Sequence, residues 1–243
     1  MSGPPTVEAT RYVAPLREGG SLPALIEADD DGLYVLKFRG AGQGPKALVA
    51  ELIGGEIARA LGRAEPDPEI QDLLRASPGL NLGLDYLPGS LAYDPAAERP
   101  VDAALAADIV WFDALMTNVD RSARNPNLLV WHERLWLIDH GAALYAHHHD
   151  WRLTDAWSRP FPIGRDHVLL PLAGPISDAH ERLSARLDRT VIEAVVGLIP
   201  DLWLADHAAE AAPAERRSAY AEHLVRRLAS GAFVEEADDA RAA

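Results

Sequence analysis

Three polar side chains, Asp120, Asn125 and Asp139, lie around the apolar runs of one short stretch, NVDRSARNPNLLVWHERLWLIDHG, which covers residues 118–141. Its apolar runs 128–131 and 135–138 are separated by three polar residues, a pattern that predicts an antiparallel hairpin. Because a hairpin returns the chain to its start, Asn125 before it and Asp139 after it are expected at the same end. Their oxygens are hard ligands suited to Mg²⁺. Asp120 can reach the same space and accept a proton from a hydroxyl nucleophile, and phosphoryl transfer requires this division of labour.

The basic residues are distributed unevenly between the two types. Of 23 basic residues only Lys37 and Lys46 are lysines, so 21 are arginines. A lysine retained in such a chain indicates a need for a compact ammonium, which the planar guanidinium cannot imitate. Lys37 lies inside the apolar run YVLKF, where an ammonium requires a partner or a ligand.

The elements that would position Lys37 lie in the first third of the chain. SLPALIEA and LYVLKF read as strands joined by an Asp-Gly hairpin turn, DDDG. The glycine-rich loop GAGQGP follows, and then a helix over about residues 46–61 that Gly62 ends. A strand in LNLGLDYLPGS closes this part. The pattern predicts a lobe of small sheet plus helix over residues 1–88.

The remaining residues, 89–243, are expected to form a mainly helical lobe. Asp102 can cap a helix whose apolar residues recur at spacings of three and four up to Met116. The segment 142–180 reads as irregular, helices are expected within 178–199 and 213–229, and the charged tail EEADDARAA is expected to fray. The fold class is α+β, in two lobes that together make one domain.

These motifs together resemble a known family. DRSARN has the spacing of the protein-kinase catalytic loop, an Asp followed five residues later by an Asn, and IDHG stands where kinases carry Asp-Phe-Gly. The His variant, with NVDRSARNPNLL, YVLKFRG and LVAEL…IARALG, is similar to the HipA-like kinases, a bacterial branch of the kinase fold. The likeness covers residues 18–141. The chain departs from the eukaryotic pattern, because Gly-x-Gly-x-x-Gly is absent and Asn-Val-Asp replaces His-Arg-Asp.

The resemblance implies a role for each matching position. Lys37 would contact the α- and β-phosphates of ATP, paired with a helix glutamate. Asp120 would be the base, and Asn125 and Asp139 would hold Mg²⁺. The backbone of Asp85, Tyr86 and Leu87 would hold the adenine. Ser21, in the turn EGGSLP, is expected to shape the turn, with a phosphate contact or self-phosphorylation as the alternative.

Two glutamates compete for the place beside Lys37. At about 100° per residue, Glu51 lies in an arc of small uncharged residues, whereas Glu56 lies in a stripe with Arg59 and Arg63. A carboxylate in a close-packed arc needs a buried cation, and one in a charged stripe is expected in solvent. The pattern and the family alignment both select Glu51.

Composition and charge exclude several classes of protein. The 23 basic and 37 acidic residues give a net charge of −14, which disfavours direct binding to nucleic acid. There is no apolar run of membrane-spanning length, and neither a secretory signal nor a cysteine is found. These features fit a cytoplasmic enzyme.

The sequence leaves the phosphate acceptor open. A Ser or Thr of a protein is the favoured acceptor, a small molecule is the alternative, and a pseudokinase that binds a nucleotide or partner is the reading from another class. A regulatory protein partner is also left open. The run of His147, His148 and His149 is expected in a solvated loop rather than around a metal.

Overall fold

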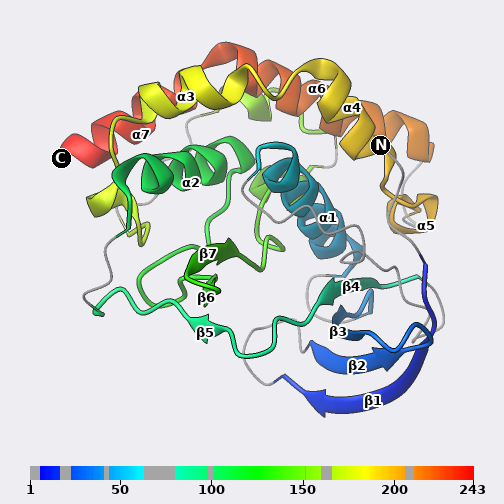
Figure 1. Cartoon of the computed structure of the whole chain (residues 1–243). Coiled ribbons are helices and arrows are strands. Elements are labelled where there is room, and N and C mark those ends of the chain that lie inside the picture. Colours follow the sequence, from blue (N-terminus) through cyan, green and yellow to red (C-terminus); the bar gives the residue numbers. More distant parts are fainter. Residues whose placement is uncertain are drawn as a thin grey trace.

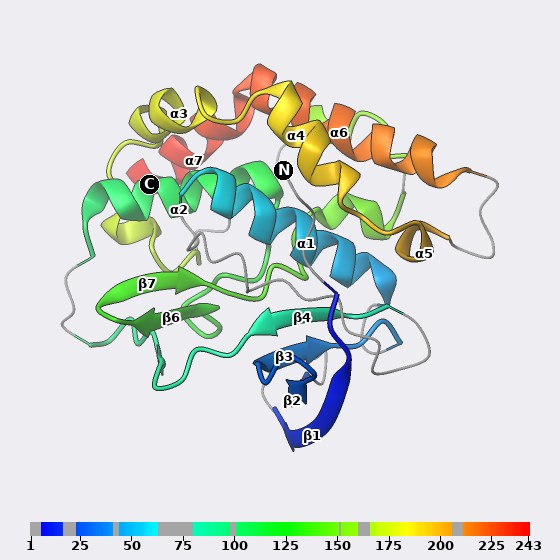
Figure 2. The same ribbon diagram turned by 45° about the vertical axis from the view of Figure 1, so that its right-hand side comes forward.

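The computed structural model describes residues 6–16, 23–40, 44–62, 80–97, 101–150, 152–159, 166–205 and 211–243. Ser21 and residues 41–43 of the glycine-rich loop lie outside these ranges. Figures 1 and 2 show three levels: two small sheets, helices α1 and α2 above them, and the C-terminal helices over α1 and α2.

The first sheet has four antiparallel strands in the order β1-β2-β3-β4. These are β1 (Ala9–Pro15), β2 (Ala24–Ala28), β3 (Leu33–Lys37) and β4 (Leu82–Asp85). β2 and β3 pair with Ala24 opposite Leu36, as the Asp-Gly turn between them predicts. β3 is therefore an inner strand, and Lys37, at its end, lies opposite Leu82 of β4.

Helix α1 (Pro45–Ala60) belongs to the main core rather than to the small sheet. Its buried residues, among them Leu52, Ile53 and Ile57, pack in one cluster with α2 (Ala103–Met116) and the C-terminal helices. The sheet has a separate small cluster around Ile26 and Leu36. The main core is thus continuous across residue 88, and the division into 1–88 and 89–243 stays a prediction.

The predicted hairpin is present and belongs to a second sheet. β6 (Leu128–Trp131) and β7 (Arg134–Leu137) are antiparallel, and the short β5 (Leu91–Ala92) pairs with β6. The hairpin follows α2, whose first turn Asp102 caps by accepting the N–H of Leu105 at 2.9 Å. The sequence did not predict β5, because two residues carry no periodicity.

The C-terminal helices are α3 (Ile176–Ser184), α4 (Arg189–Gly197), α5 (Asp201–Leu204), α6 (Pro213–Ser230) and α7 (Ala232–Ala242). In the described part of the segment expected to be irregular, three short 3₁₀ turns are present: Tyr145–His148, Ala156–Ser158 and Leu170–Leu172. None of the described helices is long and apolar enough to cross a membrane. The fold is α+β with small antiparallel sheets, as the sequence predicts.

The prediction of a frayed tail was wrong. Helix α7 buries Phe233, Val234 and Ala237, and its Asp238 accepts the N–H groups of Ile176 and Ser177 at 2.8 and 3.0 Å. A carboxylate on the last helix therefore satisfies the free donors at the start of α3. The many charged residues of this segment obscured the pattern of an amphipathic helix, which its contact with α3 holds in place.

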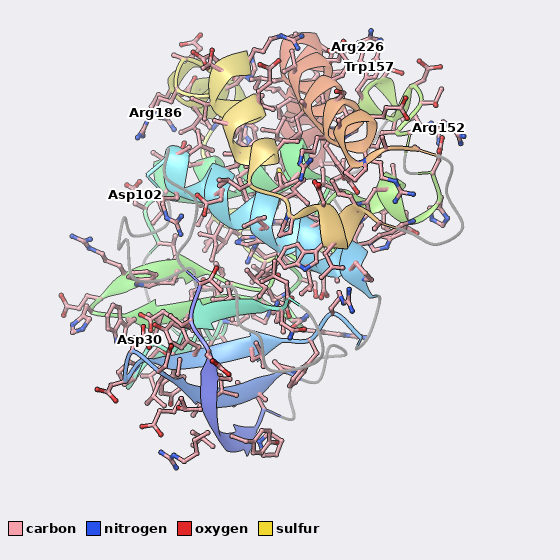
Figure 3. The ribbon with its side chains drawn as sticks, turned by 90° about the vertical axis from the view of Figure 1, so that its right-hand side faces the viewer. Asp30, Asp102, Arg152, Trp157, Arg186 and Arg226 are labelled. Atoms are coloured by element: carbon pink, nitrogen blue, oxygen red, sulfur yellow. The ribbon has the colours of Figure 1, made fainter. Side chains whose placement is uncertain are left out.

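The outer surface is strongly charged. Figure 3 shows Asp30, Arg152 and Arg186 projecting outward from three different parts of the chain. Arg226 of α6 lies beside Trp157, with its guanidinium carbon 5.8 Å from the centre of the indole ring. A guanidinium over an aromatic face is a stabilising arrangement, and here it joins α6 to the second 3₁₀ turn.

Candidate active site

Lys37 lies between two carboxylates that come from distant parts of the chain. Its Nζ is 2.9 Å from Glu51 Oε2 and 2.7 Å from Asp139 Oδ1. Lys37 is 7% exposed and Glu51 is 2% exposed. The inner strand β3, helix α1 and the end of the hairpin thus meet at one ammonium. The structure brings together the pair that the helix-face argument selected.

The charges of this cluster depend on one another. Burial alone would lower the pKa of the Lys37 ammonium, but Glu51 and Asp139 outweigh it and hold that pKa above its usual value. Burial raises the pKa of Glu51 despite the attraction of Lys37. Burial also acts to raise the pKa of Asp139, but Lys37 overcomes this and lowers it. One ammonium faces two carboxylates, so the formal charge of the ionised group is −1.

The backbone after the hairpin directs Asp139 toward Lys37. Asp139 has a left-handed φ of 54°, and the next two N–H groups, of His140 and Gly141, donate to Glu51 and Asp139 respectively. The His140 ring is buried and stands edge-on to Phe112 with centroids 5.4 Å apart. Burial lowers the pKa of His140 to about 3, so this ring is neutral and serves as a packing element.

The chain that enters the hairpin, at the same end as Asp139, carries Asp120 and Asn125. Ile138 donates its N–H to the Asn127 carbonyl at 3.1 Å, so the residues that flank this hairpin end adjoin one another, as predicted. Asn125 Nδ2 donates to Asp120 Oδ2 at 2.9 Å. The amide oxygen of Asn125 and the second oxygen of Asp120 are then the atoms that remain to face a cation or a hydroxyl.

Sequence reasoning missed the residues that hold this loop in place. Asp113 of α2 binds Arg121, Asn118 and His167, and Asn127 Nδ2 donates to the Asp120 carbonyl at 2.7 Å. The sequence signal was an Asp inside the apolar run IVWFDALM, because a buried carboxylate requires partners.

The segment expected to face adenine follows β4. Asp85 lies opposite Tyr34, the Tyr86 N–H donates to the Leu33 carbonyl at 3.0 Å, and Leu87 is 8% exposed. Tyr86 could donate to a purine only by giving up that sheet bond. The adenine contact assigned to this segment stays a prediction. Of the three residues assigned to it, Tyr86 has the N–H that is least available, because it is already bonded within the sheet.

Two expectations about polar side chains were wrong. Glu56 is not in solvent: it is 5% exposed and accepts from Arg59 at 2.6 Å. His147 is not in a solvated loop either, since it is fully buried with its Nδ1 3.0 Å from the Tyr220 hydroxyl. His149, by contrast, is exposed. Among the described residues, no group of three or more His, Cys, Asp and Glu could hold a metal ion.

Lys46, the second lysine, ties helix α1 to the segment after Asp139. Its Nζ donates to the carbonyls of His147 and His148 at 2.7 and 3.2 Å. An ammonium is suited to the carbonyls at the end of a helical turn, which are left without donors. This contact holds the start of α1, while Glu51 holds its middle.

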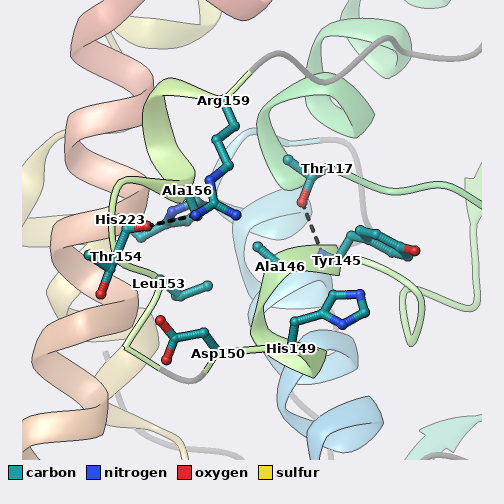
Figure 4. Close-up of a pocket in the computed structure, with 10 residues that line it drawn as sticks. All are labelled: Thr117, Tyr145, Ala146, His149, Asp150, Leu153, Thr154, Ala156, Arg159 and His223. Atoms are coloured by element: carbon teal, nitrogen blue, oxygen red, sulfur yellow. Dashed lines mark hydrogen bonds between the residues drawn. The ribbon is translucent and has the colours of Figure 1, made fainter.

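A separate cavity of about 270 Å³ lies beyond this segment (Figure 4). Its wall includes Thr117, whose hydroxyl accepts the Tyr145 N–H at 3.1 Å, and His223 of α6. Both ring nitrogens of His223 are enclosed without a partner among the described residues. None of the side chains assigned to the nucleotide lines this cavity, so it is distinct from the cluster at Lys37.

The donor set at Lys37 and Asp139 fits a magnesium-bound nucleotide. Mg²⁺ is held in such sites by one or two protein oxygens plus water and phosphate, rather than by a full protein cage. Asp139 and Asn125 supply a carboxylate and an amide oxygen of this kind. The cluster at Lys37 has a formal charge of −1, which a cation would offset, and an ammonium is a charge of the sign that phosphates require.

Comparison with known proteins identifies the class. A solved structure of a proinflammatory kinase from Helicobacter pylori, CtkA, is similar over 98% of each chain, with a TM-score of 0.63 and 13% sequence identity. At that identity the likeness shows the fold, which is that of a kinase. A search of curated proteins finds no match.

The family model for HipA-like kinases matches residues 10–237. Because the match covers most of the chain, the protein belongs to the HipA-like kinase family. The family predicted from the motifs within residues 18–141 is confirmed, and so is a kinase-like phosphotransferase. Membership of a kinase family also implies the use of ATP.

Proposed function

We propose that the protein transfers the γ-phosphate of Mg-ATP to the hydroxyl of a Ser or Thr on a protein substrate. The observation that carries the proposal is the placement of Lys37 between Glu51 and Asp139, at 2.9 and 2.7 Å. A kinase requires its strand lysine paired with the helix glutamate, and its metal-binding Asp beside them.

Each residue of the cluster has a separate task in this scheme. Lys37 binds the α- and β-phosphates, and Glu51 keeps its ammonium in place. Asp139 and Asn125 hold Mg²⁺, which when bound neutralises the charge that develops on the transferred group.

Asp120 receives the proton of the acceptor. Its Oδ2 is bound by Asn125 and, at 3.4 Å, by Asn127 Nδ2. These two amides fix the plane of the carboxylate, so that Oδ1 is presented to an incoming hydroxyl. A base held within hydrogen-bonding reach contributes about 10²–10⁴-fold to such a reaction.

The test combines labelled ATP, a cell lysate and one substitution. Asp120→Asn keeps the shape of the side chain but removes its basicity. We expect wild type to label protein bands at Ser or Thr, and Asp120→Asn to lose about 10²–10⁴-fold of turnover with its affinity for Mg-ATP nearly unchanged. Affinity is read from the rise in melting temperature on adding Mg-ATP, which follows mass action.

The alternatives give different results in the same assay. Labelled small molecules without labelled protein would identify a small-molecule kinase. Nucleotide binding with no label in either fraction would support a pseudokinase. A wild type that shows no shift with millimolar Mg-ATP would remove the nucleotide site itself, and turnover of Asp120→Asn within threefold of wild type would remove Asp120 from the mechanism.

A further inference from the structure

The loop that carries Asp120 is fastened to a buried charge on α2. Asp113 has no exposed side chain, and its Oδ2 is 2.5 Å from Arg121 Nε, whose side chain is also fully enclosed. Its Oδ1 accepts from Asn118 Nδ2 at 2.8 Å. One carboxylate therefore binds the residue that begins the loop and the residue directly after Asp120.

Arg121 carries this anchoring to the far end of the loop. Its Nη1 donates to the carbonyl of Asn127 and, at 3.5 Å, to that of Pro126. Asn127 in turn donates to the Asp120 carbonyl. The guanidinium fork thus spans the loop from Asp113 beneath it to the residues where β6 begins. A lysine could not make both sets of contacts, because its ammonium is a single point.

A third element joins the cluster from the segment before α3. His167 Nδ1 accepts the Leu169 N–H at 3.2 Å, so the ring hydrogen is on Nε2, which lies 3.0 Å from Asp113 Oδ2. The Val168 N–H donates to the Arg121 carbonyl at 3.1 Å. The strand-like contact between Ser122 and His167 runs beside these bonds.

The cluster is electrostatically strong because it is enclosed. Burial alone would raise the pKa of the Asp113 carboxyl, but Arg121 and His167 hold that pKa well below its usual range. Asp113 is consequently an anion at all working pH values. Loss of one partner would leave the other as an uncompensated buried charge, so the loop is held in one arrangement.

We infer that Asp113, Arg121 and His167 form a positioning unit that sets the place of Asp120 for phosphoryl transfer. The inference rests on the proposed function, in which Asp120 is the base. In kinases switched by phosphorylation, arginines order a loop by pairing with the added phosphate. Here Arg121 is already paired with a carboxylate of the chain itself and is enclosed, so the loop is ordered without such an addition.

The experiment compares substitutions at two buried carboxylates of the same helix. Asp113→Asn removes the central charge, Arg121→Lys keeps the charge but not the fork, and His167→Gln is the mildest change. Asp108→Asn is the matched control, since Asp108 is also on α2, is 1% exposed and binds Arg182 at 2.8 Å. Its partner Arg182 belongs to α3 and not to the loop 118–127.

Two quantities are measured on each full-length variant, well below its melting temperature. The first measurement gives kcat and the KM for ATP, with kcat calculated per molecule that binds Mg-ATP. We expect Asp113→Asn to lower kcat about 10²-fold, because a displacement of 1 Å has that effect, with KM for ATP within twofold. Arg121→Lys and His167→Gln should give smaller losses of the same kind. Asp108→Asn should lose stability and keep kcat.

The second quantity is amide hydrogen exchange in peptides that cover residues 118–127, which requires no activity. We expect faster exchange there in Asp113→Asn and Arg121→Lys, and exchange like that of wild type in Asp108→Asn.

Unchanged exchange in residues 118–127 would overturn the inference whether or not the wild type is active. Faster exchange with unchanged kcat, or an equal loss of kcat in Asp108→Asn, would overturn it as well. A wild type without transfer would count against the proposed function, while exchange would still decide whether the cluster places the loop.

Discussion

At the scale of single residues, the position of Lys37 explains why a chain so rich in arginine retains a lysine there. The ammonium fits between Glu51 and Asp139, with both distances below 3 Å. A guanidinium is planar and wider, and it would approach two carboxylates from different elements only by displacing one of them. Lys46 follows the same logic, because it contacts two adjacent carbonyls of one helical turn.

The first prediction separates the two glutamates of α1. Both are buried, but Glu51 binds Lys37 whereas Glu56 binds Arg59 on its own helix. Glu51→Gln should lower turnover of ATP by roughly tenfold or more, because Lys37 loses the charge that positions it. Glu56→Gln should leave turnover unchanged and alter only stability. Steady-state kinetics and urea unfolding of both variants provide the comparison, and equal effects on turnover would reject the assignment.

The candidate site residues differ in how far the sequence could predict their positions. Lys37, Asp120, Asn125 and Asp139 lie in motifs whose spacing is local, and the helical period separated Glu51 from Glu56. The burial of Glu56 and of His147 depends on α4, α6 and other elements far along the chain, which no local pattern encodes. Asp113 was visible as a charge in an apolar run, but its partner His167 is 54 residues away.

At the scale of elements, helix α1 is placed by a close contact with the segment after the hairpin. Gly54 lies directly against His140: a Cβ added at Gly54 would lie 2.7 Å from the Cβ of His140. The neutral His140 ring also packs against Phe112 of α2. Glycine at position 54 therefore lets α1 come near enough for Glu51 to reach Lys37.

The second prediction concerns this contact. Gly54→Ala should destabilise the fold by about 1–3 kcal/mol, the usual result of overpacking a core. It should also lower turnover, since α1 must move away from His140 and carry Glu51 with it. Gly197→Ala in α4 is the matched control, because nothing lies within 4 Å of its added Cβ. It should be neutral or stabilising. Unfolding in urea and ATP turnover are the two measurements, and a stable, fully active Gly54→Ala would contradict the packing argument.

Local signals predicted some elements well and others poorly. The Asp-Gly turn, the cap at Asp102 and the hairpin between two apolar runs are short-range features, and all three were confirmed. The break between α3 and α4 and the helical tail were not predicted. In the tail, helix formation depends on Phe233 and Val234 packing on α2 and α3 and on Asp238 capping α3.

At the scale of the whole molecule, one continuous core joins α1 and α2 to the C-terminal helices, and several histidines are buried in it. His140 and His223 are each 3% exposed, and His147 is fully buried. Burial lowers the pKa of both His140 and His223 to about 3, and it lowers the pKa of His147 well below the usual value. Three neutral imidazoles in a core make the stability of the fold sensitive to acid.

The last prediction follows from the sign of these shifts. Because the pKa of His223 is about 3 in the folded chain and about 6.5 in the unfolded one, the unfolded state binds more protons between these values. Stability contributed by the neutral ring is therefore present above pH 6.5 and is lost as the pH falls toward 3. Between pH 7 and pH 5 the loss is about 2 kcal/mol for one such histidine, and His140 adds a similar amount.

Urea unfolding at both pH values measures the total loss of stability. His223→Leu should reduce the fall by about 2 kcal/mol, whereas His149→Gln, which removes an exposed ring, should leave it as in wild type. A fall that is the same in His223→Leu as in wild type would show that this imidazole takes up its proton without unfolding the core.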